Sequence, residues 1–371
     1  MVSASSTPSR RDLWNVLAKL APVVALVLLV VVLCIFSEPF RKPENFVKIV
    51  NQWSFVGIVA IGMTWVIIVG GIDLSVGSMV ALLAGAGMMA MNRVYAQQVL
   101  DALPAELRST TALADVLMVA PSAVKDAVSI WPAVGAGAAI MLIGGGLLGL
   151  LNGLGITVGR LAPFIATLGT MAIYRSLILA PTQGSEIRGA IPAFGEFAAP
   201  QHGVVIPLIE SSRGRPLVAT WPIILFFSIA VVAELSLRCT SFGRQTLAIG
   251  DNPAAARYAG IRVGRVTTAV YVMSGILCGV AALLNASRLN SVSSSQTGMM
   301  YELDAIAAVV IGGTSMRGGS GWIIGTVVGV LLLGVIDNML LMLDVNTHLQ
   351  GLVKGCIIIA AVLFQRSRAA R

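Results

Sequence analysis

The sequence predicts an all-α polytopic membrane protein with about ten transmembrane helices. Among its 371 residues, 57% are hydrophobic and only 11% are charged, whereas a soluble domain carries about 25% charged residues. The apolar residues form runs of about 17 to 22, the length an α-helix needs to cross a bilayer core of about 30 Å. The 39 glycines agree with this class because small residues let membrane helices pack closely.

The apolar runs place the spans in order along the chain, with boundaries defined to within a few residues. The first run follows the basic segment SRRDLW and lacks a small-residue cleavage site, so we interpret it as an uncleaved span. The eighth run is short, and is either completed by apolar neighbours or partly broken. The predicted spans are residues 18–36, 54–71, 76–91, 133–152, 162–180, 217–237, 266–284, 303–313, 322–340 and 350–364.

The second and third spans belong to one long apolar run whose only charged residue is Asp73. As a single helix, residues 54–91 would extend about 57 Å, which is too long for one span. Gly70–Gly71 is therefore predicted to mark a reversal or a break. The motif GGIDLSVGS at 70–78 is echoed by GGTSMRGGS at 312–320. An internal repeat of the kind found in transporters and a chance match among many glycines both explain this echo.

Ten spans place both termini on one side of the membrane, and the basic residues indicate that this side is the cytoplasm. Cytoplasmic loops are enriched in Lys and Arg. We therefore predict cytoplasmic tails at 1–17 and 366–371 around a transmembrane domain at 18–365. The formal charge of +8 reflects this sidedness and does not indicate nucleic-acid binding. The longest inner segment, 238–265, carries Arg238, Arg244, Arg257, Arg262 and Arg265 against one acid, Asp251.

Two outer segments, 92–130 and 182–216, are predicted to form extramembranous structure on the opposite side. The first mixes both charge signs with helical spacing and two prolines, and the second is rich in Gly, Pro and charged residues. Passive connectors and docking surfaces are both consistent with such segments.

The stretch GDNPAAARYAGIRVGR at 250–265 predicts a short polar helix within this apolar chain. Asn252 suits the N-cap, Pro253 suits the first helical position, and Gly260 suits a left-handed residue after the helix. So short a helix is marginal alone in water, so something must pack on it. Its alanine face fits the groove of a cytoplasmic protein. The alternative, a helix lying on anionic lipid headgroups, is disfavoured because large apolar residues are missing.

Four blocks in this order resemble the ribose/xylose/galactoside branch of ABC importer permeases. They are GMTWVIIVGGIDLSVGS at 62–78, LAPFIATLGTMAIYRS at 161–176, LAIGDNPAAARYAGIRV at 247–263 and YELDAIAAVVIGGTSMRGGSG at 301–321. The resemblance spans about residues 46–365. It is weakest at 92–130, which is longer than the usual outer connection.

This resemblance implies a permease fold in the bacterial inner membrane, surrounded by lipid and working as a pair with a second copy or a paralogue. It also implies a coupling loop at 238–265 that enters a cleft of a separate ATPase subunit, and a periplasmic sugar-binding protein that docks on the periplasmic segments. The implied coupling residues are Gly250, Asn252, Pro253, Ala255, Ala256, Arg257 and Gly260.

The chain itself lacks the chemistry of an ATPase. It contains no G-x4-G-K-[ST] phosphate loop, and GGTSMRGG lacks the required lysine. We therefore expect no cofactor in this chain, with ATP and Mg²⁺ bound by the partner subunit. His202 and His348 have no metal-spaced neighbour, so no metal site is predicted either.

Polar residues within the spans are candidates for a sugar path. Asp73 and Ser75 either line a polar helix break or cap the next helix. Asn152, Thr167 and Asn338 supply neutral hydrogen-bonding groups, although bonding between helices explains them too. Arg175 and Lys354 either snorkel to the outer surface or meet acidic residues of the binding protein.

The predicted function is that of a transmembrane permease subunit that imports a monosaccharide or related polyol from a periplasmic binding protein. The alternative is an ion-coupled secondary transporter of a small polar solute. Such a transporter requires ionisable residues within its spans, and Asp73 is the best candidate for that position.

Overall fold

The computed structural model describes residues 10–199, 202–210 and 216–346, together with 349, 351–353, 355–356 and 359. This described part is mostly helical, but four short strands form two separate two-stranded antiparallel sheets. The all-α class is therefore corrected to a helical protein with two small antiparallel sheets. The longest strand, β2 (Gly203–Glu210), is rich in the β-branched residues Val and Ile, which favour extended backbone.

Seven helices in the described part are long and apolar enough to cross a membrane. The first helix, α1 (Arg10–Phe36), adds a shorter apolar stretch at Leu20–Phe36. The predicted eighth span is α15 (Tyr301–Ile311), a helix of only 11 residues. The predicted last span at 350–364 and the tail at 366–371 lie outside the described residues, apart from a few isolated positions of the span. The seven are α3 (Pro43–Ile68), α4 (Val76–Ala102), α8 (Trp131–Thr157), α9 (Pro163–Thr182), α11 (Trp221–Cys239), α14 (Val263–Leu289) and α16 (Ile323–Met342).

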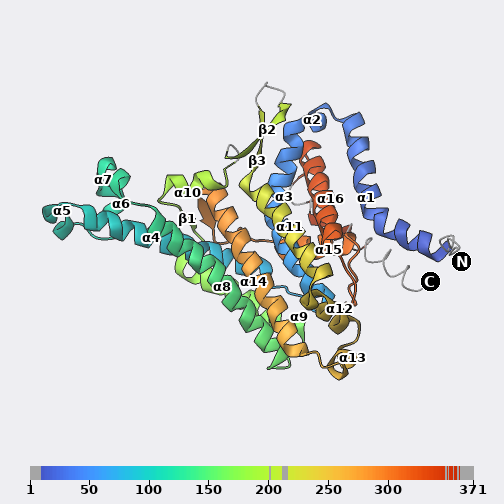
Figure 1. Ribbon diagram of the computed structural model, residues 1–371. Coiled ribbons are helices and arrows are strands. Elements are labelled where there is room, and N and C mark those ends of the chain that lie inside the picture. The colour runs from blue at the N-terminus through green and yellow to red at the C-terminus, as the bar shows by residue number, and fades with distance from the viewer. Residues whose placement is uncertain are drawn as a thin grey trace, which may run out of the picture.

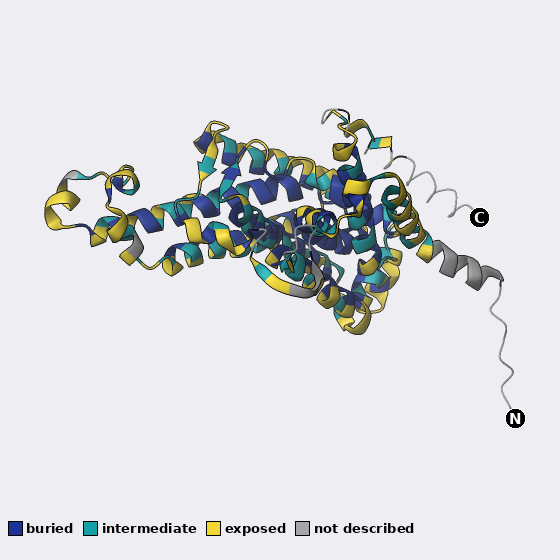
Figure 2. Ribbon diagram, turned by 90° about the horizontal axis from the view of Figure 1, so that it is seen from above, coloured by how far each residue is buried: buried dark blue, intermediate teal, exposed yellow. Residues whose placement is uncertain are grey.

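The helix α14 lies at the centre of the bundle, packed against α3, α4 and α8. A second group is formed by α16, which packs on α3, α15 and α1 (Figure 1). Figure 2 shows the buried residues along the middle of the molecule and the exposed ones on its outer faces. Because α3 is packed on several sides, it is buried over most of its length.

Glycines bring α8 and α14 into direct backbone contact. A Cβ atom on Gly145 would lie 2.2 Å from the carbonyl oxygen of Gly275, and one on Gly279 would lie 2.2 Å from that of Met141. A Cβ on Gly149 would similarly lie 2.3 Å from the carbonyl oxygen of Tyr271. This is the close approach that small residues permit between membrane helices.

The outer segment 92–130 begins as a continuation of α4, which extends to Ala102 instead of ending near 91 as predicted. Its polar residues are good helix formers, so the helix persists beyond the apolar run. Three short helices follow and project from the bundle (Figure 1): α5 (Ala105–Thr110), α6 (Val116–Val119) and α7 (Ser122–Ala127).

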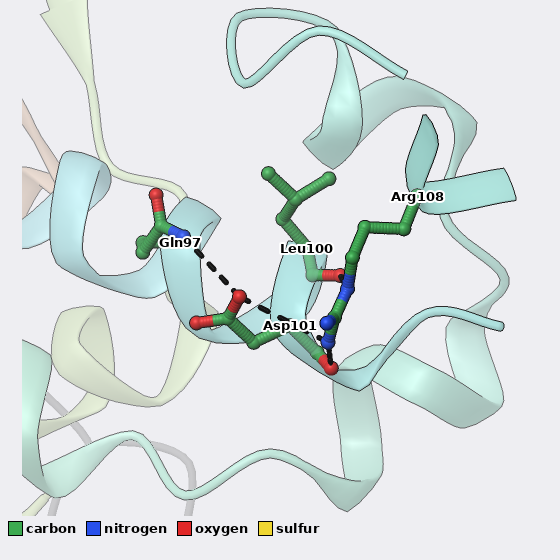
Figure 3. Close-up of polar contacts among 4 residues, drawn as sticks. All are labelled: Gln97, Leu100, Asp101 and Arg108. Atoms are coloured by element: carbon green, nitrogen blue, oxygen red, sulfur yellow. Dashed lines mark hydrogen bonds and ion pairs between the residues drawn. The ribbon is translucent and has the colours of Figure 1, made fainter. Parts of the chain in front are cut away.

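Arg108 in α5 closes the end of α4 (Figure 3). Its Nε donates to the carbonyl oxygen of Leu100 at 3.2 Å, and its Nη2 donates to that of Asp101. The Gln97 amide donates to the Asp101 carboxylate at 3.3 Å. Basic side chains commonly satisfy the last carbonyls of a helix in this way.

The outer segment 182–216 holds the second set of small elements. The strand β1 (Glu186–Arg188) pairs with β4 (Ser291–Ser293), and β2 pairs with β3 (Pro216–Thr220). Between β1 and β2 in the sequence lies α10 (Pro192–Phe197), which packs on α14. The short helix α2 (Glu38–Arg41) lies at the same end as β2 and β3 (Figure 1).

Candidate functional site

The predicted short helix exists as α13 (Pro253–Tyr258), and its N-terminal cap is confirmed. The Asn252 Oδ1 atom accepts hydrogen bonds from the backbone N–H groups of Ala254 and Ala255, both at 3.0 Å. Pro253 occupies the first helical turn, where its missing N–H costs nothing. The N-terminal end of α13 is therefore stabilised by Asn252 and Pro253, its own neighbouring residues.

The C-terminal end of α13 is closed by a Schellman motif. Gly260 has φ +81°, the left-handed conformation predicted for it. Its N–H donates to the Arg257 carbonyl, and the Ile261 N–H donates to the Ala256 carbonyl, both at 3.0 Å. Both ends are thus closed, and α13 is a short rigid rod.

Most of α13 faces away from the rest of the chain. Tyr258 is 94% exposed, and Asn252, Pro253, Ala255, Arg257 and Gly260 are exposed as well. Ala256 differs from these residues, since it is 4% exposed and packs inward. In Figure 1, α13 lies at the end of the molecule opposite α2 and β2.

Gly250 also faces inward, at the end of α12 (Ser241–Asp251). A Cβ atom on Gly250 would lie 1.8 Å from the carbonyl oxygen of Ile68 and 2.4 Å from the backbone nitrogen of Gly319. That nitrogen donates to the Ile68 carbonyl at 2.9 Å. Gly250 and Ala256, two of the predicted coupling residues, therefore contact this chain and fix the loop to the bundle, while their role toward an ATPase subunit stays a prediction.

An aromatic contact reinforces this seat. The rings of Trp65 in α3 and Phe242 in α12 stack with centroids 5.3 Å apart. Thr246 and Ile249 on the same face of α12 are buried too. The helix α12 is thus fixed to the end of α3 by side chains and by backbone.

The end of α3 is the first of two similar helix breaks. Gly70 has φ +88°, its N–H donates to Ile67, and the Gly71 N–H donates to Val66. This is a second Schellman motif, so the predicted break at Gly70–Gly71 is confirmed. The chain then runs without helix until α4 begins at Val76.

The end of α15 repeats this cap. Gly313 has φ +90°, its N–H donates to Val310, and the Thr314 N–H donates to Val309. The left-handed residue is the second glycine of the pair here, whereas it is the first in the earlier motif. The two motifs thus share a cap but are one residue out of register, and their breaks, 69–75 and 312–322, differ in length.

Four of the five predicted path residues meet at the first break, three of them in one hydrogen-bonded chain. The Asp73 Oδ1 atom accepts from the Ser75 N–H at 2.9 Å and from its hydroxyl at 2.6 Å. The Asn152 amide in α8 donates to the same hydroxyl oxygen at 2.8 Å. The fourth residue, Thr167 in α9, donates its hydroxyl to the Ile72 carbonyl at 3.2 Å. These bonds join the break to α8 and α9.

The cluster is closed to solvent, but not every polar atom in and beside it is hydrogen-bonded. Asp73, Ser75 and Thr167 are 0% exposed and Asn152 is 1% exposed. Within the part of the chain that the structure describes, Asp73 Oδ2 and the hydroxyls of Tyr271 and Ser274 are buried without hydrogen-bond partners. Such groups are costly to bury without hydrogen-bond partners.

Tyr174 in α9 belongs to this cluster and was missed from the sequence. Its hydroxyl donates to the Leu148 carbonyl at 3.1 Å and lies 3.5 Å from Asn152 Oδ1. Its only signal was a tyrosine near the middle of an apolar run, which is not specific.

Asn338, the fifth predicted path residue, lies apart from this cluster. Its amide and that of Asn45 in α3 exchange two hydrogen bonds, each at 3.0 Å. Both side chains are buried between α3 and α16. The interhelical alternative therefore describes Asn338 in this conformation.

Of the two predicted docking residues, the structure describes only Arg175. Its Nη1 atom donates to the carbonyl oxygens of Ser294 and Thr297 at 3.1 and 3.0 Å. Arg175 thereby fastens the loop between β4 and α15 instead of projecting freely outward. Lys354 lies outside the described residues.

Glu234 in α11 is a further polar residue that sequence reasoning did not assign. Its Oε2 atom accepts from the Ile323 N–H at 2.7 Å, so it caps the start of α16. Its other oxygen pairs with Arg238, four residues later. Carboxylates at helix N-termini are stabilising, but the partner helix could not be identified from local spacing.

Comparison with known proteins places this arrangement among membrane transport subunits. Residues 45–362 match the family described as "Branched-chain amino acid transport system / permease component". The chain is 38% identical to the ribose import permease protein RbsC of Bacillus subtilis, with 96% of this chain and 95% of the relative covered. It is 34% identical to RbsC of Escherichia coli K12, with 93% of each covered. It is also 34% identical to the galactose/methyl galactoside import permease protein MglC of that strain, with 94% of each covered. No solved structure matches the chain.

Proposed function

Since the chain belongs to this family of ABC importer permeases, in its ribose and galactoside branch, we propose that it forms the path by which a monosaccharide or related polyol enters the cell. Relatives named for ribose and for galactose are similar to it to nearly the same degree. The proposed substrate class therefore covers both and names neither.

In this proposal the protein spans the bacterial inner membrane about ten times, with both termini in the cytoplasm. The basic residues of 238–265 support this orientation, because they gather on the side that carries α13. The segments 92–130 and 182–216 then face the periplasm, together with α10 and the strands. A periplasmic sugar-binding protein docks on this outer side, and a second copy or a paralogue completes the path.

The helix α13 is the proposed handle for a separate ATPase subunit, which binds ATP and Mg²⁺. Two properties support this role. Both ends of α13 are capped by hydrogen bonds within the chain, so the helix is formed before a partner binds. Its outward face consists of small residues around Arg257 and the exposed Tyr258, a shape that fits a cleft.

Movement of α13 reaches the membrane through Gly250. This residue lies against the Ile68 carbonyl, two positions before the left-handed Gly70. A displacement of α12 therefore acts directly on the break at 69–75. The same break holds Asp73 and Ser75, which bond to Asn152 in α8.

The break is the proposed site where the path opens. The buried, unpaired oxygens of Asp73 in the break and of Tyr271 in α14, whose hydroxyl lies against Gly71, offer hydrogen bonds to sugar hydroxyls once α8 and α9 separate from the break. Irregular backbone at membrane depth is tolerated where it lines such a cavity. Alternating access then consists of making and breaking the bonds of this cluster.

The observation that carries the proposal is the seating of a doubly capped, exposed helix on a polar break between two spans. The test is uptake of labelled ribose and galactose by proteoliposomes containing this chain, with and without its ATPase and binding-protein partners. We expect uptake only with both partners and ATP. Accumulation driven by an ion gradient without nucleotide would establish the secondary-transporter alternative instead.

A further inference from the structure

A pocket of about 610 Å³ lies where the end of α11, the start of α12 and the second break meet. It is distinct from the exposed face of α13 and from the Asp73 cluster. Its lining combines two arginines, a run of backbone from the glycine-rich break, and apolar side chains. The lining residues are Leu237, Arg238, Arg244, Leu247, Gly313, Gly319, Ser320, Gly321 and Trp322.

The charge of this pocket is positive. Arg238 is paired with Glu234, but that carboxylate also caps α16, so it is shared between two donors. The Arg244 side chain is exposed, and its Nη1 lies 3.4 Å from the Cys239 carbonyl, a long hydrogen bond. The other acid close by is Asp251, whose backbone lies against Gly319. Two arginines and no acidic residue thus line the pocket, and the neighbouring Glu234 carboxylate is already paired.

An apolar stripe on α11 leads into the pocket. Val231 precedes Arg238 by seven residues and Leu235 precedes it by three, which places all three on one helix face. Val231 is 58% exposed and Leu235 is 57% exposed. Within the pocket, Leu247 and Trp322 continue this apolar surface.

We propose that this pocket binds an anionic phospholipid of the leaflet on the α13 side. Arg238 and Arg244 hold the headgroup phosphate, since guanidinium groups bind phosphate oxygens in pairs. An acyl chain lies along Val231 and Leu235. An acidic segment of a partner protein would use the arginines but not the stripe, which is why the structure favours a lipid.

Such a lipid would touch α12, which carries α13, and the break at 312–322, which contacts Ile68. It would therefore stabilise, from the membrane side, the contact between α12 and the backbone at the end of α3. This inference rests on the pocket and the membrane span alone, and its test measures binding and not transport.

The test is native mass spectrometry of the purified full chain with phosphatidylglycerol or phosphatidylcholine. We expect the anionic lipid to bind the wild-type protein about five- to thirtyfold more tightly, as expected for one or two arginine contacts. The variant Arg244→Gln should lose most of this preference, and Arg244→Lys should keep part of it. The matched control Arg262→Gln removes an exposed arginine elsewhere on the same side and should keep the full preference.

Four outcomes would overturn the proposal. Equal binding of the two lipids by the wild-type protein would remove the anionic preference. An equal loss in Arg262→Gln would show general charge attraction. Displacement of the lipid by inorganic phosphate at the same concentration would identify a site for a free anion. Unchanged lipid binding in Arg244→Gln, with weaker association of the ATPase subunit, would assign the pocket to a protein partner.

Discussion

Replacing Gly250 with alanine tests whether the coupling segment rests on the first helix break through backbone contact. The added Cβ would lie 1.8 Å from the Ile68 carbonyl oxygen and 2.4 Å from the Gly319 nitrogen. Cβ atoms essentially never approach other heavy atoms within 3.0 Å, so α12 and the break must separate by roughly 1 Å. Neither neighbour is a side chain that can rotate away.

The expected cost follows from two terms. Overpacking of this kind costs about 1–3 kcal/mol, and weakening the buried bond from Gly319 to Ile68 adds about 0.5–1.5 kcal/mol. We therefore expect Gly250→Ala to lose about 1.5–4.5 kcal/mol of stability. Because the displaced contact joins α12 to the break, ATP-driven uptake should fall more than ATPase activity does.

The assay is thermal unfolding of the detergent-purified protein, followed by uptake in proteoliposomes. Gly169→Ala in α9 is the matched control, because a Cβ there would meet nothing within 4 Å. That control should be neutral or slightly stabilising, since alanine favours helix. If Gly250→Ala unfolds at the same temperature as Gly169→Ala and transports normally, the backbone seat does not exist as described.

Three further variants probe the other parts of the site. Gly260→Val should strain the left-handed residue after α13 and uncouple ATP hydrolysis from uptake. Gly260→Asn should retain coupling because asparagine tolerates that conformation. Normal uptake by the valine variant would count against the coupling role of α13. Asp73→Ala should lower the free energy of unfolding by about 1–3 kcal/mol because it leaves the Ser75 donors unpaired. Asp73→Asn keeps an acceptor and should lower it less. Equal losses in the two variants would contradict the role of these hydrogen bonds. Asn45→Leu and Asn338→Leu should each destabilise the protein by about 1–3 kcal/mol, and the double variant should cost less than their sum; strict additivity of the unfolding free energies would show that the two amides do not interact.

Features set by neighbouring residues could be predicted from the sequence. Asn252, Pro253 and Gly260 define α13 through interactions within a few residues, and the structure has both caps as expected. The break at Gly70–Gly71 followed from the length of an apolar run and the conformational freedom of glycine. These are local consequences of chain chemistry, so one sequence suffices for them.

Features that depend on distant contacts could not be predicted in the same way. Gly250 was assigned to the coupling loop from the resemblance of its motif, and its packing on Ile68 was not foreseen. Arg175 was placed outward, yet it holds a loop more than a hundred residues away. Glu234 caps a helix that begins far along the chain. Nothing in the spacing around these residues encodes which segment folds against them.

The glycine seam between α8 and α14 restricts how this protein can change shape. Where main chain lies on main chain, a shift of either helix along the other drives carbonyl oxygens into the opposing backbone, as the positions of Gly145 and Gly279 illustrate. We therefore expect the two helices to move together as one rigid unit. We therefore predict that any bending is concentrated in the non-helical stretches 69–75 and 312–322.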